Sequence, residues 1–172
     1  MASDFKTENE LRQEICEVGR WLHQKGYVAS TDGNISTRLP GDRVLATPTM
    51  IGKGMMRPDD LVIVDLQGRK LEGRRNASSE LAMHLLIYNR RPDVGAVVHA
   101  HPPTATGYAA AGIPLNKALI SEIVLSLGCV PLARYGTPGT PELSETLKDL
   151  VPHYDAVLMA NQIGRASCRE RV

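Results

Sequence analysis

At 172 residues, with 42% hydrophobic and 23% charged residues, the chain has the size and composition of one globular domain. A formal net charge of +1 gives no field that would attract nucleic acid, and no apolar run is long enough to span a bilayer. The polar start is not a secretory signal, and the three cysteines are far apart without CxxC spacing. We therefore expect a cytoplasmic protein that binds neither nucleic acid nor membrane.

Hydrophobic patterning predicts helices and strands that alternate along the chain. The first helix is predicted over residues 8–25, where apolar residues recur at spacings of three and four until Gly26 ends the pattern. The other predicted helices cover residues 78–91, 103–112 and 142–151, and residues 117–128 are predicted to be helical or of mixed structure. The predicted strands cover 33–39, 44–49, 59–66, 70–73, 94–101, 130–135 and 155–161. The turn "PGDR" makes the first two strands a hairpin, so we expect an α/β domain with a mixed sheet.

Two histidines stand one residue apart in "VVHAHPP", at the end of a predicted strand. Side chains at positions i and i+2 of a strand point to the same face, so His99 and His101 can converge on one metal ion. Pro102 and Pro103 end the strand, at the kind of position where ligands commonly bind. Two ordinary histidines at a strand end would give the same pattern, and the spacing alone leaves both interpretations open.

The segment "NASSE" combines two hydroxyls with the start of a predicted helix. Backbone N–H groups at a helix start bind anions, and Ser78 or Ser79 is expected to cap the helix. Glu80 lies in the first turn, where the helix dipole favours a carboxylate in any protein. Beside a divalent cation, the same carboxylate can act as a general acid or base. A plain helix cap remains the alternative.

Two further segments, "TDGNIS" and "ATPT", carry small and hydroxyl-bearing residues near predicted strand ends. Gly33 and Asn34 suggest a turn with exposed N–H groups, while Thr47 and Thr49 add hydroxyls. Ordinary hairpin punctuation explains each segment equally well when it is taken alone.

In their order along the chain, GNIS, TPT, SSE, HxH and a last strand that ends in Asn resemble the class II aldolase/adducin family, with the greatest likeness to the L-fuculose-phosphate aldolases. The likeness runs from about residue 8 to Asn161. It implies a three-layer α/β/α fold around a central mixed, largely antiparallel sheet. It also implies a homotetramer that binds a small sugar phosphate.

The resemblance also implies roles for individual residues. His99 and His101 match two of the three zinc-binding histidines of the family, and Glu80 matches the catalytic glutamate, which can also ligate Zn²⁺. The substrate phosphate is expected at positions that match the family's phosphate site: Gly33, Asn34, Thr49, Ser78 and Ser79. The implied reaction is zinc-dependent cleavage of a small ketose phosphate, similar to L-fuculose 1-phosphate, to dihydroxyacetone phosphate and an aldehyde.

The chain also departs from the fuculose-phosphate pattern. Met50 stands where those enzymes have glycine and could crowd the phosphate, and "LISEIVLSLG" lacks the tyrosine that helps to donate a proton. Gln162 stands where the third zinc histidine is expected, and an amide is a poor ligand for zinc. An epimerase, a dehydratase or a decarboxylase on the same scaffold is an alternative, as is a non-catalytic adducin-like domain. Glu80 argues against the epimerases, which carry Asp there, and together with the histidine pair against a non-catalytic domain.

The last ten residues fit no predicted element. Residues 163–172 resemble a translated sequencing adapter, so we expect a family domain over residues 1–162 that is incomplete at its C-terminal end, followed by a non-native tail. On this interpretation the natural chain has histidine at position 162. The 172-residue chain is then expected to bind zinc weakly and to be inactive.

Overall fold

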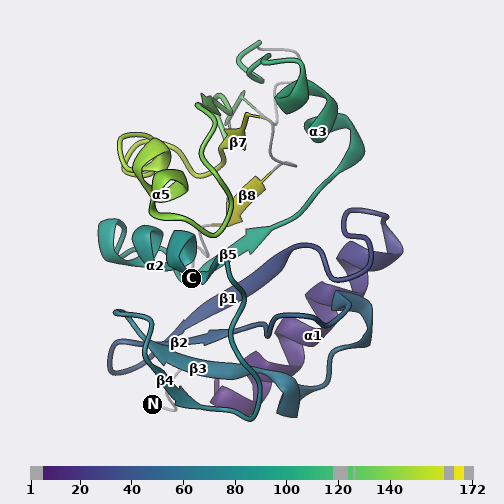
Figure 1. Cartoon of the computed structure of the whole chain (residues 1–172), viewed down its shortest axis with the longest axis vertical. Helices are drawn as coiled ribbons and strands as arrows, with labels where there is room; N and C mark the ends of the chain where they lie inside the picture. The colour runs from purple at the N-terminus through teal and green to yellow at the C-terminus, as the bar shows by residue number, and fades with distance from the viewer. Residues whose placement is uncertain (1–5, 118–123, 126, 161–164, 169–172) are drawn as a thin grey trace.

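The computed structural model describes residues 6–117, 124–125, 127–160 and 165–168 (Figure 1). Its helical elements are α1 Glu8–Gln24, η1 Lys53–Met55, η2 Pro58–Asp60, α2 Leu81–Arg90, α3 Pro103–Ala110 and α5 Pro141–Leu147. Its strands are β1 Asn34–Leu39, β2 Arg43–Ala46, β3 Val62–Asp65, β4 Lys70–Glu72, β5 Ala96–His99, β6 Leu132–Ala133, β7 Leu158–Met159 and β8 Arg165–Cys168. The predicted order of elements is confirmed from α1 to β7, although most of the segment 117–128 lies outside the described residues.

Six strands form the central sheet, in the order β4-β3-β2-β1-β5-β8, and every neighbouring pair is antiparallel. Parallel pairing occurs between β6 and β7, which form a separate two-stranded sheet (Figure 1). The α/β class with a largely antiparallel central sheet is therefore confirmed. The predicted hairpin is also confirmed, since β1 and β2 pair across a short turn.

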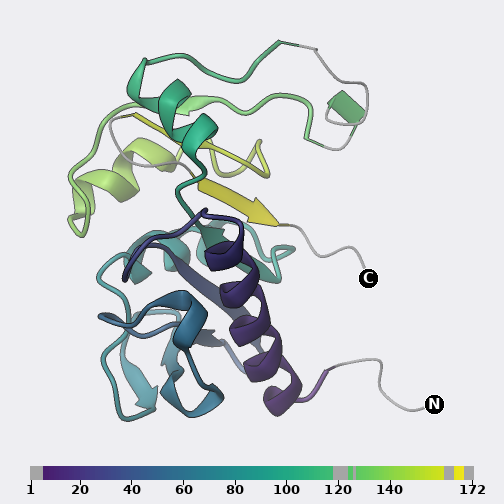
Figure 2. The same ribbon diagram turned by 90° about the vertical axis from the view of Figure 1, so that its right-hand side faces the viewer.

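Helices cover both faces of the sheet, with α1 on one face and α2 and α5 on the other (Figures 1 and 2). The alternation of side chains along β3 shows how the two cores are built, because successive residues point to opposite faces. Ile63 packs in the cluster that includes residues of α1, whereas Val62 and Val64 pack in the cluster that includes α2 and α5. The strand is fully buried, as its continuous apolar run predicts.

The helix α1 begins with a capping box and lies close against η1. The Thr7 hydroxyl accepts a hydrogen bond from the Glu10 backbone N–H, and the Glu10 carboxylate accepts one from the Thr7 N–H. Gly19 permits the close approach, since a Cβ at that position would lie 2.6 Å from the Lys53 carbonyl oxygen. The packing of α1 against η1 thus helps to fix the position of Lys53.

The strand β8 lies in the stretch for which the sequence predicts no element. Residues 165–168 pair with β5, in a register that places Arg165 opposite His99. The edge of β5 that faces away from β1 offers unpaired backbone groups, and an extended segment can pair with them whatever its side chains. Elsewhere, no helix in the described part of the chain has the length and apolar character needed to cross a bilayer.

Candidate active site

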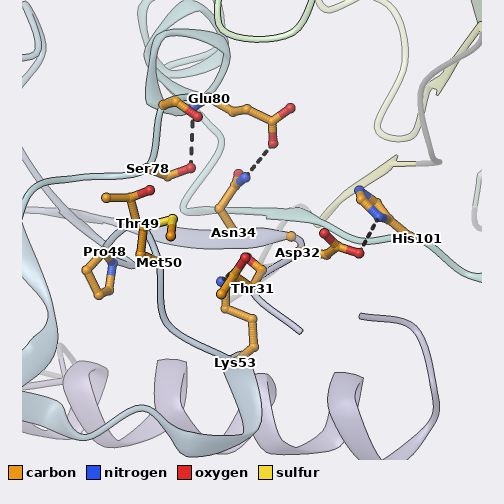
Figure 3. A pocket seen from close by; sticks show the side chains of 12 residues that line it. Thr31, Asp32, Asn34, Pro48, Thr49, Met50, Lys53, Ser78, Glu80 and His101 are labelled. Atoms are coloured by element: carbon orange, nitrogen blue, oxygen red, sulfur yellow. Dashed lines mark hydrogen bonds and ion pairs between the residues drawn. The ribbon is translucent and has the colours of Figure 1, made fainter. Parts of the chain in front are cut away.

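A cavity of about 300 Å³ lies where the loops around β1, β2 and α2 meet (Figure 3). Among the described residues, those to which the family resemblance assigns a role all line this cavity except His99, which is buried beside His101. The lining residues that the sequence predicts are Gly33, Asn34, Thr49, Ser78, Ser79, Glu80 and His101. Segments that are far apart in the sequence therefore converge on one small cavity, at the lower end of the size range of small-molecule sites.

Backbone pairing brings the predicted motifs together. The antiparallel register of β1 and β5 sets Asn34 opposite His99. The "NASSE" segment runs alongside "TPT", because the Thr49 N–H donates to the Asn76 carbonyl and the Ser78 N–H donates to the Thr47 carbonyl. The hydroxyl of Thr47 is buried and accepts a hydrogen bond from the Ile35 N–H, so this threonine holds the backbone rather than facing the cavity.

Gly33 is fixed by its conformation and by its neighbours. Its φ of +71° lies in the left-handed region, which favours glycine. A Cβ at this position would lie 2.7 Å from the His99 carbonyl oxygen and 2.7 Å from a methyl carbon of Val28. The "DGN" turn can therefore lie directly against the end of β5 because no side chain is present there.

The two histidines lie with their rings edge to face. Their Nε2 atoms are 3.1 Å apart and their ring centroids 4.9 Å apart. The strand β5 ends at His99, so His101 lies just beyond it. There the backbone N–H of His101 donates a hydrogen bond to the Tyr27 carbonyl. Burial lowers the pKa of His101, against the charges of Asp32 and Glu80, which raise it. This favours the neutral imidazole, which is the form that binds metals.

Glu80 faces Asn34 and His99. Its Oε2 atom accepts a hydrogen bond of 2.7 Å from Asn34 Nδ2 (Figure 3). The same oxygen lies 3.4 Å from His99 Nε2. The prediction that Ser78 or Ser79 caps α2 is wrong, because the N-cap position is Glu80 and no side chain caps the helix. Instead, Ser78 Oγ accepts a hydrogen bond of 3.3 Å from the Glu80 N–H, which orders the segment just before α2.

Two pairs of donor atoms at this end of the cavity, His99 with His101 and His99 with Glu80, have the spacing of adjacent metal ligands. Tetrahedral zinc with bonds of roughly 2.0–2.1 Å places its ligand atoms about 3.3 Å apart. The separations of 3.1 Å between His99 and His101 and 3.4 Å between His99 and Glu80 lie on either side of this value. Within the described ranges, however, no group of three His, Cys, Asp or Glu residues is arranged to hold an ion.

Two charged residues of the cavity escaped the sequence analysis. Asp32 lies with its Oδ2 atom 3.5 Å from His101 Nδ1, and Lys53 lines the cavity from a buried position. Asp32 directly precedes the "GN" turn and could have been noticed there. Lys53 lies in "IGKGMM", a segment without a recognisable motif, and only the fold brings it to the cavity.

Met50 lines the cavity, but its side chain is 77% exposed. Its φ of +59° shows that the backbone keeps the left-handed conformation that glycine adopts most easily. The side chain of Met50 is therefore directed mainly to solvent. The energetic cost of methionine in place of glycine arises from the backbone conformation. Gln162 and most of the "LISEIVLSLG" segment, on which the other departures depend, lie outside the described residues.

Comparisons with known proteins agree on one family. The profile of the class II aldolase and adducin N-terminal domain matches residues 13–162. The chain is 34% identical over 173 residues to the 3-oxo-tetronate 4-phosphate decarboxylase of Escherichia coli O6:H1, which covers 98% of this chain and 81% of that protein. YgbL of Klebsiella pneumoniae has a similar solved structure, with a TM-score of 0.89 and 30% identity over 96% of this chain and 82% of its own. A solved L-fuculose 1-phosphate aldolase has a TM-score of 0.84 and 32% identity over 98% of this chain and 78% of its own.

Proposed function

The chain belongs to the class II aldolase and adducin family, and from this premise we propose that it is a metal-dependent lyase that breaks a carbon–carbon bond in a small phosphorylated ketone. One observation carries the proposal. The Glu80 carboxylate lies between the Asn34 amide and the histidine pair, in a cavity that also contains the hydroxyls of Ser78 and Thr49. A base, two metal-binding nitrogens and an anion site are thus combined at the scale of a small sugar phosphate.

We propose that His99 and His101 hold a divalent ion, with Glu80 as a further ligand, and that this ion is Zn²⁺. When bound, the ion supplies positive charge for the carbonyl and hydroxyl oxygens of the substrate. Neutral imidazoles are well suited to zinc, and the buried surroundings of His99 strengthen electrostatic interactions there.

Glu80 is proposed to move the proton. Its Oε2 atom is held by Asn34, so the carboxylate keeps one orientation while the substrate changes charge. When the carbon–carbon bond breaks, the electron pair stays on the carbon next to the ketone. A protonated Glu80 then delivers its proton to that carbon and becomes the carboxylate, which is protonated again by the substrate hydroxyl in aldol cleavage or by solvent in decarboxylation.

The phosphate is proposed to bind at the other end of the cavity. Ser78 and Ser79 stand just before Glu80, the N-cap of α2, where the helix dipole favours negative charge. Thr49 adds a hydroxyl from the opposite loop, while Gly33 and Asn34 approach from β1. The site would then hold the phosphate at one end and the reacting carbons near Glu80.

Two substrate types fit this scheme. The first is a ketose phosphate similar to L-fuculose 1-phosphate, which an aldolase cleaves to dihydroxyacetone phosphate and an aldehyde. The second is a sugar-acid phosphate, favoured by the likeness to the 3-oxo-tetronate 4-phosphate decarboxylase over almost the whole chain. By carbon balance, loss of CO₂ from that acid also leaves dihydroxyacetone phosphate. One product therefore reports on both reactions.

The test measures the formation of dihydroxyacetone phosphate through a coupled glycerol-phosphate dehydrogenase reaction, after addition of Zn²⁺, Co²⁺ or Mg²⁺. The assay is run on the 172-residue chain, which we propose to be nearly inactive, and on the Gln162→His variant. We expect product from one of the two substrates, together with either CO₂ or an aldehyde. If neither variant releases dihydroxyacetone phosphate from either substrate while metal is bound, the lyase proposal fails in favour of an epimerase, a dehydratase or a non-catalytic domain.

We also propose that the complete protein is a cytoplasmic homotetramer that takes a small sugar phosphate and binds neither nucleic acid nor membrane. Light scattering on the purified complete protein measures its oligomeric state directly. A single species with the mass of the monomer at all concentrations would contradict the tetramer.

A further inference from the structure

Lys53 is a buried lysine in the wall of the cavity. It is the first residue of η1, and only 1% of its surface is exposed. Lysine is almost never buried to this degree unless its charge is compensated, because removal of an ammonium group from water is costly. The site therefore either compensates this charge with its own groups or leaves it for a ligand.

The ammonium group joins the two loops that frame the cavity. Lys53 Nζ donates to the Thr31 carbonyl at 2.9 Å and to the Ile51 carbonyl at 2.8 Å. The first carbonyl precedes the "DGN" turn, and the second follows "TPTM". Figure 3 shows the side chain extending toward Thr31 from below the pocket. Lys53 thus fixes the distance between two loops that carry predicted phosphate-binding residues.

These two bonds leave the ammonium group incompletely compensated. An ammonium group has three N–H donors, and the described residues supply two acceptors, both of them neutral carbonyls. Within the part of the chain that the structure describes, no carboxylate lies within 4 Å of Lys53 Nζ. Burial lowers the pKa of Lys53, while the more distant charges of Asp32 and Glu80 raise it.

The charged residues that line the cavity supply little positive charge for a phosphate group. Among its described lining residues, Asp32 and Glu80 are carboxylates, and Lys53 is the one lysine or arginine. A phosphate group that carries a charge of about −1.5 to −2 would be repelled by both carboxylates. Hydroxyls and backbone N–H groups can bind it, but they provide no net positive charge.

We propose that Lys53 is the cation of the phosphate subsite, which ties the two loops together and directs its positive charge at the phosphate held by Thr49, Ser78 and Ser79. This inference rests on the proposed function for the identity of the anion. It adds a specificity-determining residue that selects a phosphorylated substrate over an unphosphorylated sugar. The charge of Lys53 acts strongly on the phosphate, because the site is buried and its effective dielectric constant is low.

The test measures equilibrium binding of inorganic phosphate to the full chain by calorimetry, with and without prior dialysis against EDTA to identify phosphate captured by metal. Lys53→Gln removes the charge but keeps an N–H donor for the loop carbonyls, whereas Lys53→Met removes both. We expect each variant to lose at least about tenfold in phosphate affinity, while Lys53→Gln keeps more of the thermal stability. The matched control, Lys25→Met, removes an equal charge from the exposed C-cap of α1 and should bind phosphate as the parent does.

A second measurement needs no substitution. In a titration of the parent chain followed by the ¹⁵Nζ signals of its lysines, phosphate should shift one lysine resonance, which the Lys53→Gln variant lacks. The proposal is overturned if the parent does not bind phosphate, if Lys53→Gln binds it with unchanged affinity, or if no lysine resonance responds. If phosphate binding depends on Lys53 but no substrate is cleaved, the lyase proposal fails and this inference stands.

Discussion

The two ends of the cavity differ in how the chain builds them. The histidine end consists of Glu80, His99 and His101, and two of these residues are neighbours on one short segment. The serine end consists of Thr49, Ser78, Ser79 and Lys53, which pairing between distant loops brings together. The histidine pair is therefore encoded locally, although Glu80 joins it only through the fold. The serine end exists only once the chain has folded, so mutations that loosen loop contacts should affect it first.

The largest expected effect separates catalysis from binding. Glu80→Gln keeps the shape of the side chain and an acceptor for the Asn34 amide but removes the proton acceptor. We expect the turnover of the metal-loaded Gln162→His background to fall by roughly 10²–10⁴-fold. The affinity for inorganic phosphate should not fall and should rise by no more than about threefold, since the serine end remains intact and one repelling carboxylate is removed. Initial rates and phosphate titrations measure the two effects.

The matched control for this substitution is Glu17→Gln, an equal change on the exposed face of α1, which should leave both quantities unaltered. Retention of more than a tenth of the turnover by Glu80→Gln would remove Glu80 from the proton-transfer role.

The next effect tests the contact that joins the two ends. Gly33→Ala would place a Cβ against the His99 carbonyl in a backbone conformation that disfavours alanine. We expect a loss of about 2–4 kcal/mol in the free energy of unfolding, from the left-handed conformation and the steric overlap together. Urea unfolding measures this loss.

Gly26→Ala provides the control for backbone conformation, because Gly26 has a φ of +69° and a Cβ there would meet nothing within 4 Å. It should cost only about 1–2 kcal/mol. If the two alanine variants lose equal stability, the contact between Gly33 and the end of β5 contributes nothing.

A third prediction concerns only metal binding at the histidine end. Gln162→His supplies the imidazole that the family resemblance implies, and it should raise the zinc affinity at least about tenfold. Loss of a residue that merely supports a ligand costs 10–100-fold in many sites, so the gain of a direct ligand should be no smaller. Competition with a chromogenic chelator measures the affinity. An unchanged affinity would mean that position 162 does not face the ion, and Gln162→Ala controls for the loss of the amide.

The sequence predicts the elements well where periodicity is strong. The residues of α1 and β3 follow clear helical and buried-strand patterns, and both elements are confirmed. The N-terminus of α2 was misplaced because Ser78 and Ser79 look like caps, whereas the chain uses this segment to pair with "TPT". Pairing between distant segments leaves no local signal, so propensity alone could not find it.

The site shows the same division. Glu80, His99 and His101 could be predicted because their residue types and spacing have chemical meaning by themselves. Lys53 could not, because a lysine in a short irregular segment is normally exposed, and its burial arises from packing between distant segments, including that of Gly19 against η1. Thr47 was expected to supply a hydroxyl to the site. Its hydroxyl instead accepts a hydrogen bond from a buried backbone N–H.

The smallest expected effect concerns the rim of the serine end. Met50 has a left-handed backbone, which costs a residue with a Cβ about 1–2 kcal/mol, while glycine costs roughly 0.5–1 kcal/mol in chain entropy. Met50→Gly should therefore raise the free energy of unfolding by at most about 1 kcal/mol. Because the Met50 side chain is mostly exposed, phosphate affinity should change less than about twofold. Met55→Gly, at an equally exposed methionine in η1, lacks the strain to relieve and should destabilise the protein. A large gain in phosphate affinity from Met50→Gly would show instead that the methionine crowds the anion, as the comparison with fuculose-phosphate enzymes first predicts.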